Sequence, residues 1–176
     1  MDPVRWERVA AWNDTWALAV VFGLASIPWT YAFVVGLRIP LWPSFVASAT
    51  FYAAGRGFSG LLRGYASNAA GIVYAALTLG IVDGLLGGGP LALSVVVGAF
   101  MFLASLHEFV PILSFTPGGF FGYATMFSVH AADATAFGVP GLYGETLAAV
   151  LSMFLGAVIG LGTDELRSAV DGSGDG

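Results

Sequence analysis

A short stretch in the second half of the chain has the residue types best suited to contact a solute. It runs from Leu113 to His130, LSFTPGGFFGYATMFSVH, and its polar side chains before His130 are all hydroxyls. Pro117 has no N–H to donate, and Gly118 and Gly119 allow the backbone to leave helical geometry. In lipid, interrupted backbone is stable only where protein or a water-filled cavity covers it. We therefore expect this stretch to face the interior of a bundle, where it either lines a solute path or forms a kinked helix that packs closely on a neighbour.

The candidate solute-lining residues are small or carry a hydroxyl group, and they lie on two proline-containing segments. The first segment supplies Pro43, Ser44 and Ser48, and the second supplies Ser114, Thr116, Pro117, Gly118, Gly119, Gly122 and Thr125. The aromatic residues of the second segment have two interpretations. Either they form an apolar constriction of a pore, or they face lipid; they are Phe115, Phe120, Phe121 and Tyr123.

Four polar residues elsewhere each allow a functional and a structural interpretation. His107 and Glu108 form either a proton relay or an interfacial helix end, where the helix dipole favours histidine. Glu145 either complements the dipole at the start of the last apolar segment or points into the bundle and attracts a cation. Asn68 either hydrogen-bonds to a neighbouring helix, which is the favoured interpretation, or contacts a solute.

Several function classes lack the residues that they require. The chain has no cysteine for a disulfide, a thiolate metal site or a nucleophile. His107 and His130 are too few and too far apart to suggest a metal site, and no carboxylate pair or ATP-binding loop is evident. Six basic residues against eleven acidic ones leave no basic patch for nucleic acid. We therefore expect no enzymatic activity, no cofactor and no nucleic-acid partner, and we expect any transport to be passive or ion-coupled.

The composition is that of an integral membrane protein. Hydrophobic residues make up 57% of the 176 residues and charged residues only 10%, whereas soluble domains contain about 25% charged residues. The mean hydropathy is +0.84. At roughly 20 residues per span plus short loops, the chain has room for about six transmembrane helices. The sequence thus predicts an all-α, polytopic helix bundle in contact with the lipid bilayer.

The expected helices follow the apolar segments, which turns rich in glycine and proline separate. They fall at about residues 16–37, 41–54, 66–82, 91–106, 113–130 and 141–162. Asn13-Asp14-Thr15 offers an N-cap for the first helix, and Pro28 is expected to kink it. Residues 1–165 form a single transmembrane domain, and residues 166–176 form an acidic, glycine-rich tail that is expected to be disordered at its end.

The second and fifth segments resemble each other. Each opens with a proline, Pro43 or Pro117, and contains Ala-Thr further on, at Ala49-Thr50 and Ala124-Thr125. They are the middle members of two three-span halves, and an odd number of spans per half gives the halves opposite orientations. This pattern predicts a 3+3 inverted repeat in which the broken helices 2 and 5 mark the substrate path. The carbonyl that Pro117 frees near Leu113 is expected to meet water, a nearby hydroxyl or the second segment.

The residues Ser114–Gly122, SFTPGGFFG, resemble the YcdZ-like inner-membrane proteins, a family known as a domain of unknown function. The shared pattern is Ser-Phe-x-Pro-Gly-x-Phe-x-Gly after the fourth apolar segment. Trp42, Phe45, Tyr52 and the glycines that follow resemble the family's second segment, and the likeness covers about residues 16–161. The resemblance implies a compact multi-span membrane protein and assigns no activity. The acidic tail and the absence of lysine depart from the bacterial members.

The placement of arginine predicts the orientation. With six spans and the N-terminus inside, five arginines are cytoplasmic and one is outside; the five are Arg5, Arg8, Arg56, Arg63 and Arg167, and the one outside is Arg38. Because cytoplasmic loops carry an excess of arginine and lysine, we expect both termini to be cytoplasmic in the inner, or plasma, membrane.

These observations favour a small channel or facilitator for a small, uncharged or weakly polar solute. Its support is the broken pair of segments and the scarcity of buried charge, since an ion-coupled carrier normally needs acidic residues in mid-membrane. The alternative is a non-transport membrane protein that assembles with copies of itself or with a membrane partner. The 25 glycines suit close helix packing in either case, and we expect a homo-oligomer.

Overall fold

The computed structural model describes the backbone of residues 3–171 and the side chains of residues 14–170. Every regular element in these residues is a helix, which confirms the predicted all-α fold. The α-helices are α1 (Pro3–Tyr31), α2 (Trp42–Ala53), α3 (Gly57–Gly84), α4 (Pro90–Ser105), α5 (Thr116–Ala131) and α6 (Gly141–Asp171). A π-helix, Ala32–Leu37, extends α1, and two 3-10 turns, Leu106–Phe109 and Pro111–Leu113, connect α4 to α5.

Four of the six helices are long and apolar enough to cross a membrane. They cover Asp14–Leu37, Gly57–Gly84, Pro90–Phe109 and Gly141–Val170. The other two, α2 and α5, contain 12 and 16 residues, and at 1.5 Å per residue they extend only about 18 and 24 Å. A hydrocarbon core is about 30 Å thick. The two interrupted segments of the sequence are therefore short helices inside the bundle.

The two short helices begin in the same way. Each has a proline at its second position, Pro43 in α2 and Pro117 in α5, where the missing N–H breaks no helical hydrogen bond. In both helices the residue after the proline donates its backbone N–H three residues back, from Ser44 to Leu41 at 3.0 Å and from Gly118 to Phe115 at 2.9 Å. Thr116–Gly119 is thus the start of a helix and not a break within one.

Other boundaries differ from the sequence-based expectation. Helix α1 continues through residues 13–15, so Asn13-Asp14-Thr15 is not an N-cap, and it also continues through Pro28 before it widens into the π-helix. Helix α3 begins at Gly57, earlier than expected. Helix α6 continues to Asp171 and includes the first part of the predicted acidic tail; residues 172–176 lie outside the described residues.

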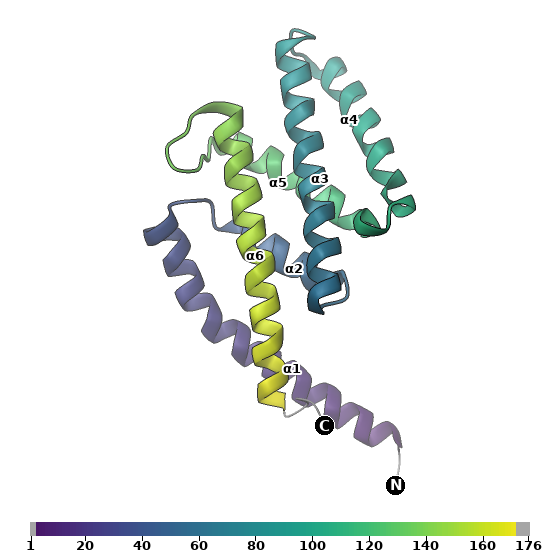
Figure 1. Cartoon of the computed structure of the whole chain (residues 1–176), viewed down its shortest axis with the longest axis vertical. Coiled ribbons are helices and arrows are strands. Elements are labelled where there is room, and N and C mark those ends of the chain that lie inside the picture. The colour runs from purple at the N-terminus through teal and green to yellow at the C-terminus, as the bar shows by residue number, and fades with distance from the viewer. Residues whose placement is uncertain (1–2, 172–176) are drawn as a thin grey trace.

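The two halves of the chain are arranged alike. In Figure 1 a half-turn about the line of view carries α1, α2 and α3 approximately onto α4, α5 and α6. The packing follows the same rule, because α2 packs chiefly on α6 while α5 packs chiefly on α3, and α1 covers α6 while α4 covers α3. This arrangement agrees with the predicted repeat. The Ala-Thr pairs, however, are offset, since Thr50 is nearer the start of α2 than Thr125 is to the start of α5.

Glycine allows the short helices to approach the long ones. A Cβ atom built at Gly122 would lie 1.9 Å from the carbonyl oxygen of Asn68, and one at Gly71 would lie 1.9 Å from that of Gly119. In the other half, a Cβ atom at Gly156 would lie 2.0 Å from the carbonyl oxygen of Ser44. These contacts join backbone to backbone, which is the type of packing that small residues allow in membranes.

Candidate functional site

The candidate site is the surface that α5 presents to α3 and to the 3-10 turn after α4. Gly118 and Gly119 lie in the first turn of α5 and are buried. A Cβ atom at Gly118 would lie 3.3 Å from Oδ1 of Asn68, and one at Gly119 would lie 3.5 Å from Nδ1 of His107. The edge formed by these two glycines thus faces two buried polar side chains, one from α3 and one from the turn.

Asn68 lies at the centre of the bundle. Its side chain is fully buried, and its Oδ1 accepts a hydrogen bond from Oγ1 of Thr50 on α2 at 3.4 Å. Its amide nitrogen, Nδ2, has no hydrogen-bond partner. The hydrogen bond between helices that the sequence favoured for Asn68 is therefore made by Oδ1 alone, and the two N–H groups of Nδ2 have no acceptor.

His107, which the sequence placed at the end of a transmembrane helix, is buried against other helices of the protein. Only 3% of its surface is exposed, and its Nε2 lies 3.0 Å from the hydroxyl of Tyr74 on α3. Its Nδ1 has no hydrogen-bond partner. The neighbouring Glu108 is exposed, so the two side chains separate and do not form the predicted pair. The ring of Tyr74 also stacks on Phe100 of α4 at 5.2 Å, which fixes its hydroxyl toward the histidine.

Unpaired buried polar atoms are costly and therefore informative. In the described part of the chain, Ser48 Oγ, Asn68 Nδ2 and His107 Nδ1 are the buried side-chain atoms without a partner. Each such atom costs about 1–3 kcal/mol. His107 Nδ1 lies beside Gly119, and the carboxamide of Asn68 lies beside Gly118; a water or a small polar solute bound there would supply the absent hydrogen bonds. An amide donor and an imidazole nitrogen can together hold a neutral group that both accepts and donates.

The carbonyl groups before the short helices are satisfied by serines of the long helices. Ser67 on α3 donates to the carbonyl oxygen of Leu113 at 3.1 Å, and Ser152 on α6 donates to that of Pro40 at 2.6 Å. The expectation that the carbonyl near Leu113 needs a partner is confirmed. The partner belongs to α3, however, and not to the second segment, because α5 lies along α3 for most of its length.

The remaining predicted lining residues fall into two groups. Pro43, Ser44, Ser48, Gly122 and Thr125 are buried, whereas Ser114, Thr116 and Pro117 are at least partly exposed. Ser44 is already occupied, since it accepts a hydrogen bond from Nε1 of Trp29 at 2.9 Å and donates to the carbonyl of Leu41 at 2.5 Å. The hydroxyl of Ser114 bonds to the carbonyl of Pro111 at 2.8 Å. The structure therefore brings only Gly118 and Gly119 of the predicted set against unpaired polar atoms of other elements.

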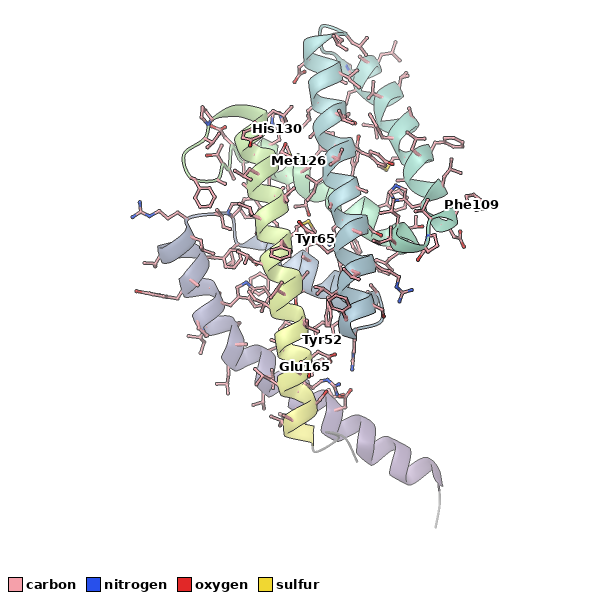
Figure 2. All side chains as sticks on the ribbon, viewed as in Figure 1. Tyr52, Tyr65, Phe109, Met126, His130 and Glu165 are labelled. Atoms are coloured by element: carbon pink, nitrogen blue, oxygen red, sulfur yellow. The ribbon has the colours of Figure 1, made fainter. Side chains whose placement is uncertain are left out.

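Glu145 points into the bundle, as one of its two interpretations predicted. Its side chain is 5% exposed, and its Oε2 lies 2.7 Å from Nδ1 of His130 at the end of α5. Figure 2 shows His130 beside the first turns of α6. This pair joins α5 to α6 and is a structural contact rather than a vacant site. No group of three or more acidic or histidine side chains that could hold a metal ion occurs among the described residues.

Sequence reasoning named Asn68 and His107 but gave neither a place in the lining. Tyr74 was missed, because a tyrosine in an apolar segment has no local signal for a buried partner. The only sequence signal is that Asn68, Gly71 and Tyr74 follow one another at helical spacing, which places them on neighbouring positions of one helix face.

Comparison with known proteins identifies a family. Neither the search of curated proteins nor the search of solved structures finds a match. The sequence pattern of the family described as "Protein of unknown function (DUF1097)" matches residues 19–167. The matched residues include the second and fifth helices and the whole of the candidate site, so this protein belongs to the DUF1097 family.

Proposed function

We propose that this membrane protein lets a small, uncharged or weakly polar solute cross the bilayer passively. The observation that carries the proposal is the pair of unpaired nitrogens, Asn68 Nδ2 and His107 Nδ1, beside the glycine edge of a short helix. Unusually short helices at matched places in two halves commonly mark the substrate path in transporters. Asn68 Nδ2 can donate a hydrogen bond to a solute, and His107 Nδ1 can donate or accept one according to its tautomer.

The class of solute follows from the charges of the bundle. The buried acids already have partners, since Glu145 contacts His130 and Asp164 contacts Arg167. An ion-coupled carrier needs an acid in mid-membrane that is available to a cation. The site instead offers neutral donors and acceptors from Asn68, His107 and Tyr74, which suit a neutral molecule with a hydroxyl, amide or carbonyl group.

The test is solute flux into liposomes that contain the purified full chain. A panel of small neutral solutes is compared between the wild type and Gly119→Leu, because a side chain at this position would enter the space beside His107. We expect flux of one or more solutes, and at least a tenfold loss in the variant. Gly98→Leu is the control, since nothing lies within 4 Å of a Cβ atom at that position. A folded Gly119→Leu variant with normal flux would sink the proposal.

The alternative function is assembly without transport. It is favoured by the use of Gly71 and Gly122 for close helix packing, because this accounts for two of the glycines without a solute. The lack of flux for every solute in the panel would support it. Assembly and transport are compatible with a homo-oligomer, which we also propose, and mass measurement in mild detergent tests that state.

We further propose the cytoplasmic location of both termini in the cell membrane. Figure 1 shows the start of α1 and the end of α6 at the same end of the molecule, which supports placing both termini on one side of the membrane. The arginine bias then favours the cytoplasmic side. Cysteine labelling tests it: a cysteine replacing Ala134 is expected to react with an impermeant reagent in intact cells, whereas one replacing Ser173 is not. The reverse pattern of labelling would invert the orientation.

The likeness of Ser114–Gly122 to the YcdZ-like proteins falls inside the residues that match the family. We therefore propose that those proteins share the short α5 and its glycine contact with α3.

A further inference from the structure

Arg38 is the unusual arginine of the described residues. Arg56 and Arg167 contact Asp164, at 3.9 and 3.0 Å, and Arg63 donates to the carbonyl of Ala54 at 2.8 Å. The exposed guanidinium of Arg38 has no hydrogen bond or ion pair with any described residue. A charge at the end of a membrane helix that no protein group neutralises is available to a ligand.

The backbone conformation of Arg38 is also unusual for arginine. Arg38 ends the π-helix with φ 54° and ψ 40°, in the left-handed region. Glycine and asparagine adopt this conformation more readily than other residues, for which it has an energetic cost. The backbone conformation at this position therefore does not favour arginine over glycine or asparagine, and what arginine adds there is its guanidinium.

A hollow surrounds the arginine. Its volume is about 690 Å³, and it is lined by Val35, Gly36, Leu37, Arg38, Phe137 and Gly138. It lies between the end of the helix that extends α1 and the loop that joins α5 to α6, two segments that Figure 1 shows next to each other. Although its side chains other than Arg38 are apolar, the surface exposed in this hollow is more polar than apolar. The hollow therefore combines one positive charge with a polar lining, as a phospholipid headgroup requires.

A second hollow continues the first along α1. Its volume is about 480 Å³, and it is lined by Ser26, Ile27, Thr30, Tyr31, Val34 and Val35. Val35 lines both hollows. From Val35 to Ser26 the helix rises about 14 Å, which is close to the thickness of one leaflet, about 15 Å, or half of the hydrocarbon core. The groove therefore has the length and the polarity of a site for an acyl chain.

We infer that this continuous surface binds an anionic glycerophospholipid, with the phosphate on Arg38 and one acyl chain along α1 between Val35 and Ser26. A guanidinium binds phosphate through paired hydrogen bonds. The polar hollow at Arg38 and the apolar second hollow meet at Val35, and together they match the two parts of a phospholipid. The inference is independent of the proposed transport function, since the site is on the outer surface of α1 and not at α5.

The first experiment measures lipid retention by native mass spectrometry on the full chain, with phosphatidylglycerol or phosphatidylcholine added in mild detergent. We expect one phosphatidylglycerol per chain to be held preferentially. Arg38→Asn should weaken its binding about fivefold, since one arginine near a lipid phosphate contributes about 1 kcal/mol, and asparagine accepts the left-handed backbone. Arg38→Lys should retain most of the preference. Equal retention in the wild type and in Arg38→Asn would overturn the inference.

The second experiment separates a lipid from other occupants of the groove. Ile27→Trp would fill the groove and should reduce retention of phosphatidylglycerol, whereas Leu24→Trp, on an exposed position of α1 outside the groove, should not. Glycerol phosphate, which has no acyl chain, should not compete at equal concentration. If glycerol phosphate competes and Ile27→Trp has no effect, the site binds a free anion. If no lipid is retained and Ile27→Trp abolishes a dimer, a second copy of the chain covers the groove. Either result contradicts the inference.

Discussion

The contact of α5 with α3 and the contact of α2 with α6 have the same construction but differ in how completely their polar groups are paired. In each contact, a glycine of the long helix, Gly71 or Gly156, lies against the backbone of the short helix. A serine of the same long helix, Ser67 or Ser152, donates a hydrogen bond to a carbonyl just before the short helix. On the α2 side, Ser44 has two hydrogen bonds and only Ser48 is unpaired. On the α5 side, Asn68 and His107 each retain an unused nitrogen.

This difference indicates that the contact of α2 with α6 is structural, whereas the contact of α5 with α3 is the candidate functional site. Two structural units with the same packing need not leave the same polar atoms unpaired. The unpaired nitrogens on the α5 side therefore come from the particular residues buried there, Asn68 and His107, and not from the packing that the two halves share. A buried, unpaired group costs stability, and such costs are found at sites where a ligand or water completes the hydrogen bonds. Variants made in matched pairs, one in each half, test this difference.

The largest effect is expected at the two backbone contacts. Gly71→Ala on α3 and Gly156→Ala on α6 would each place a Cβ atom about 2 Å from a carbonyl oxygen of the short helix, at 1.9 Å from that of Gly119 and at 2.0 Å from that of Ser44. We expect each to lower the free energy of unfolding by about 3 kcal/mol, since the helices must separate. Thermal unfolding in detergent measures this effect.

The control for these variants is Gly98→Ala, at a position with open space around it. Because alanine favours a helix over glycine, this change should be neutral or slightly stabilising. If only one of the two matched variants is destabilised, the packing of the halves is not equivalent.

An intermediate effect is expected where the halves differ. Asn68→Leu removes an unpaired amide and a single 3.4 Å hydrogen bond, so we expect it to leave stability unchanged or raise it by about 1 kcal/mol, while liposome flux falls at least tenfold. Ser48→Ala removes the unpaired hydroxyl of the other half and should reduce flux much less. Equal loss of flux in the two variants would contradict the assignment of the solute path to the α5 side.

The smallest effect is expected at the matched serines. Ser67→Ala and Ser152→Ala each remove one donor to a carbonyl before a short helix, that of Leu113 or of Pro40. Each change should cost about 1 kcal/mol, and chemical unfolding of the purified protein should show similar values for the two. If only Ser67→Ala lowers the free energy of unfolding, the carbonyl of Pro40 must find another partner, such as water. The two halves would then also differ in how much these serine hydrogen bonds stabilise them.

Several properties of this protein can be predicted from its sequence. The fraction of apolar residues and the paucity of charge determine a membrane helix bundle, because hydrocarbon excludes unpaired charge and unpaired backbone. Pro43 and Pro117, with small residues after them, mark the second and fifth helices. These local signals do not depend on which helix packs against which.

The tertiary structure alone decided the length and partners of those helices. A proline fits both a kink within a helix and the second position of a new one, so Pro117 did not reveal that α5 starts there. Asn68, Tyr74 and His107 are separated by 39 residues at most along the chain, yet no local pattern relates the histidine to the other two. They meet because Gly71 and Gly122 let α5 lie directly on α3, and the resulting burial, which depends on contacts between distant segments, leaves two nitrogens without partners.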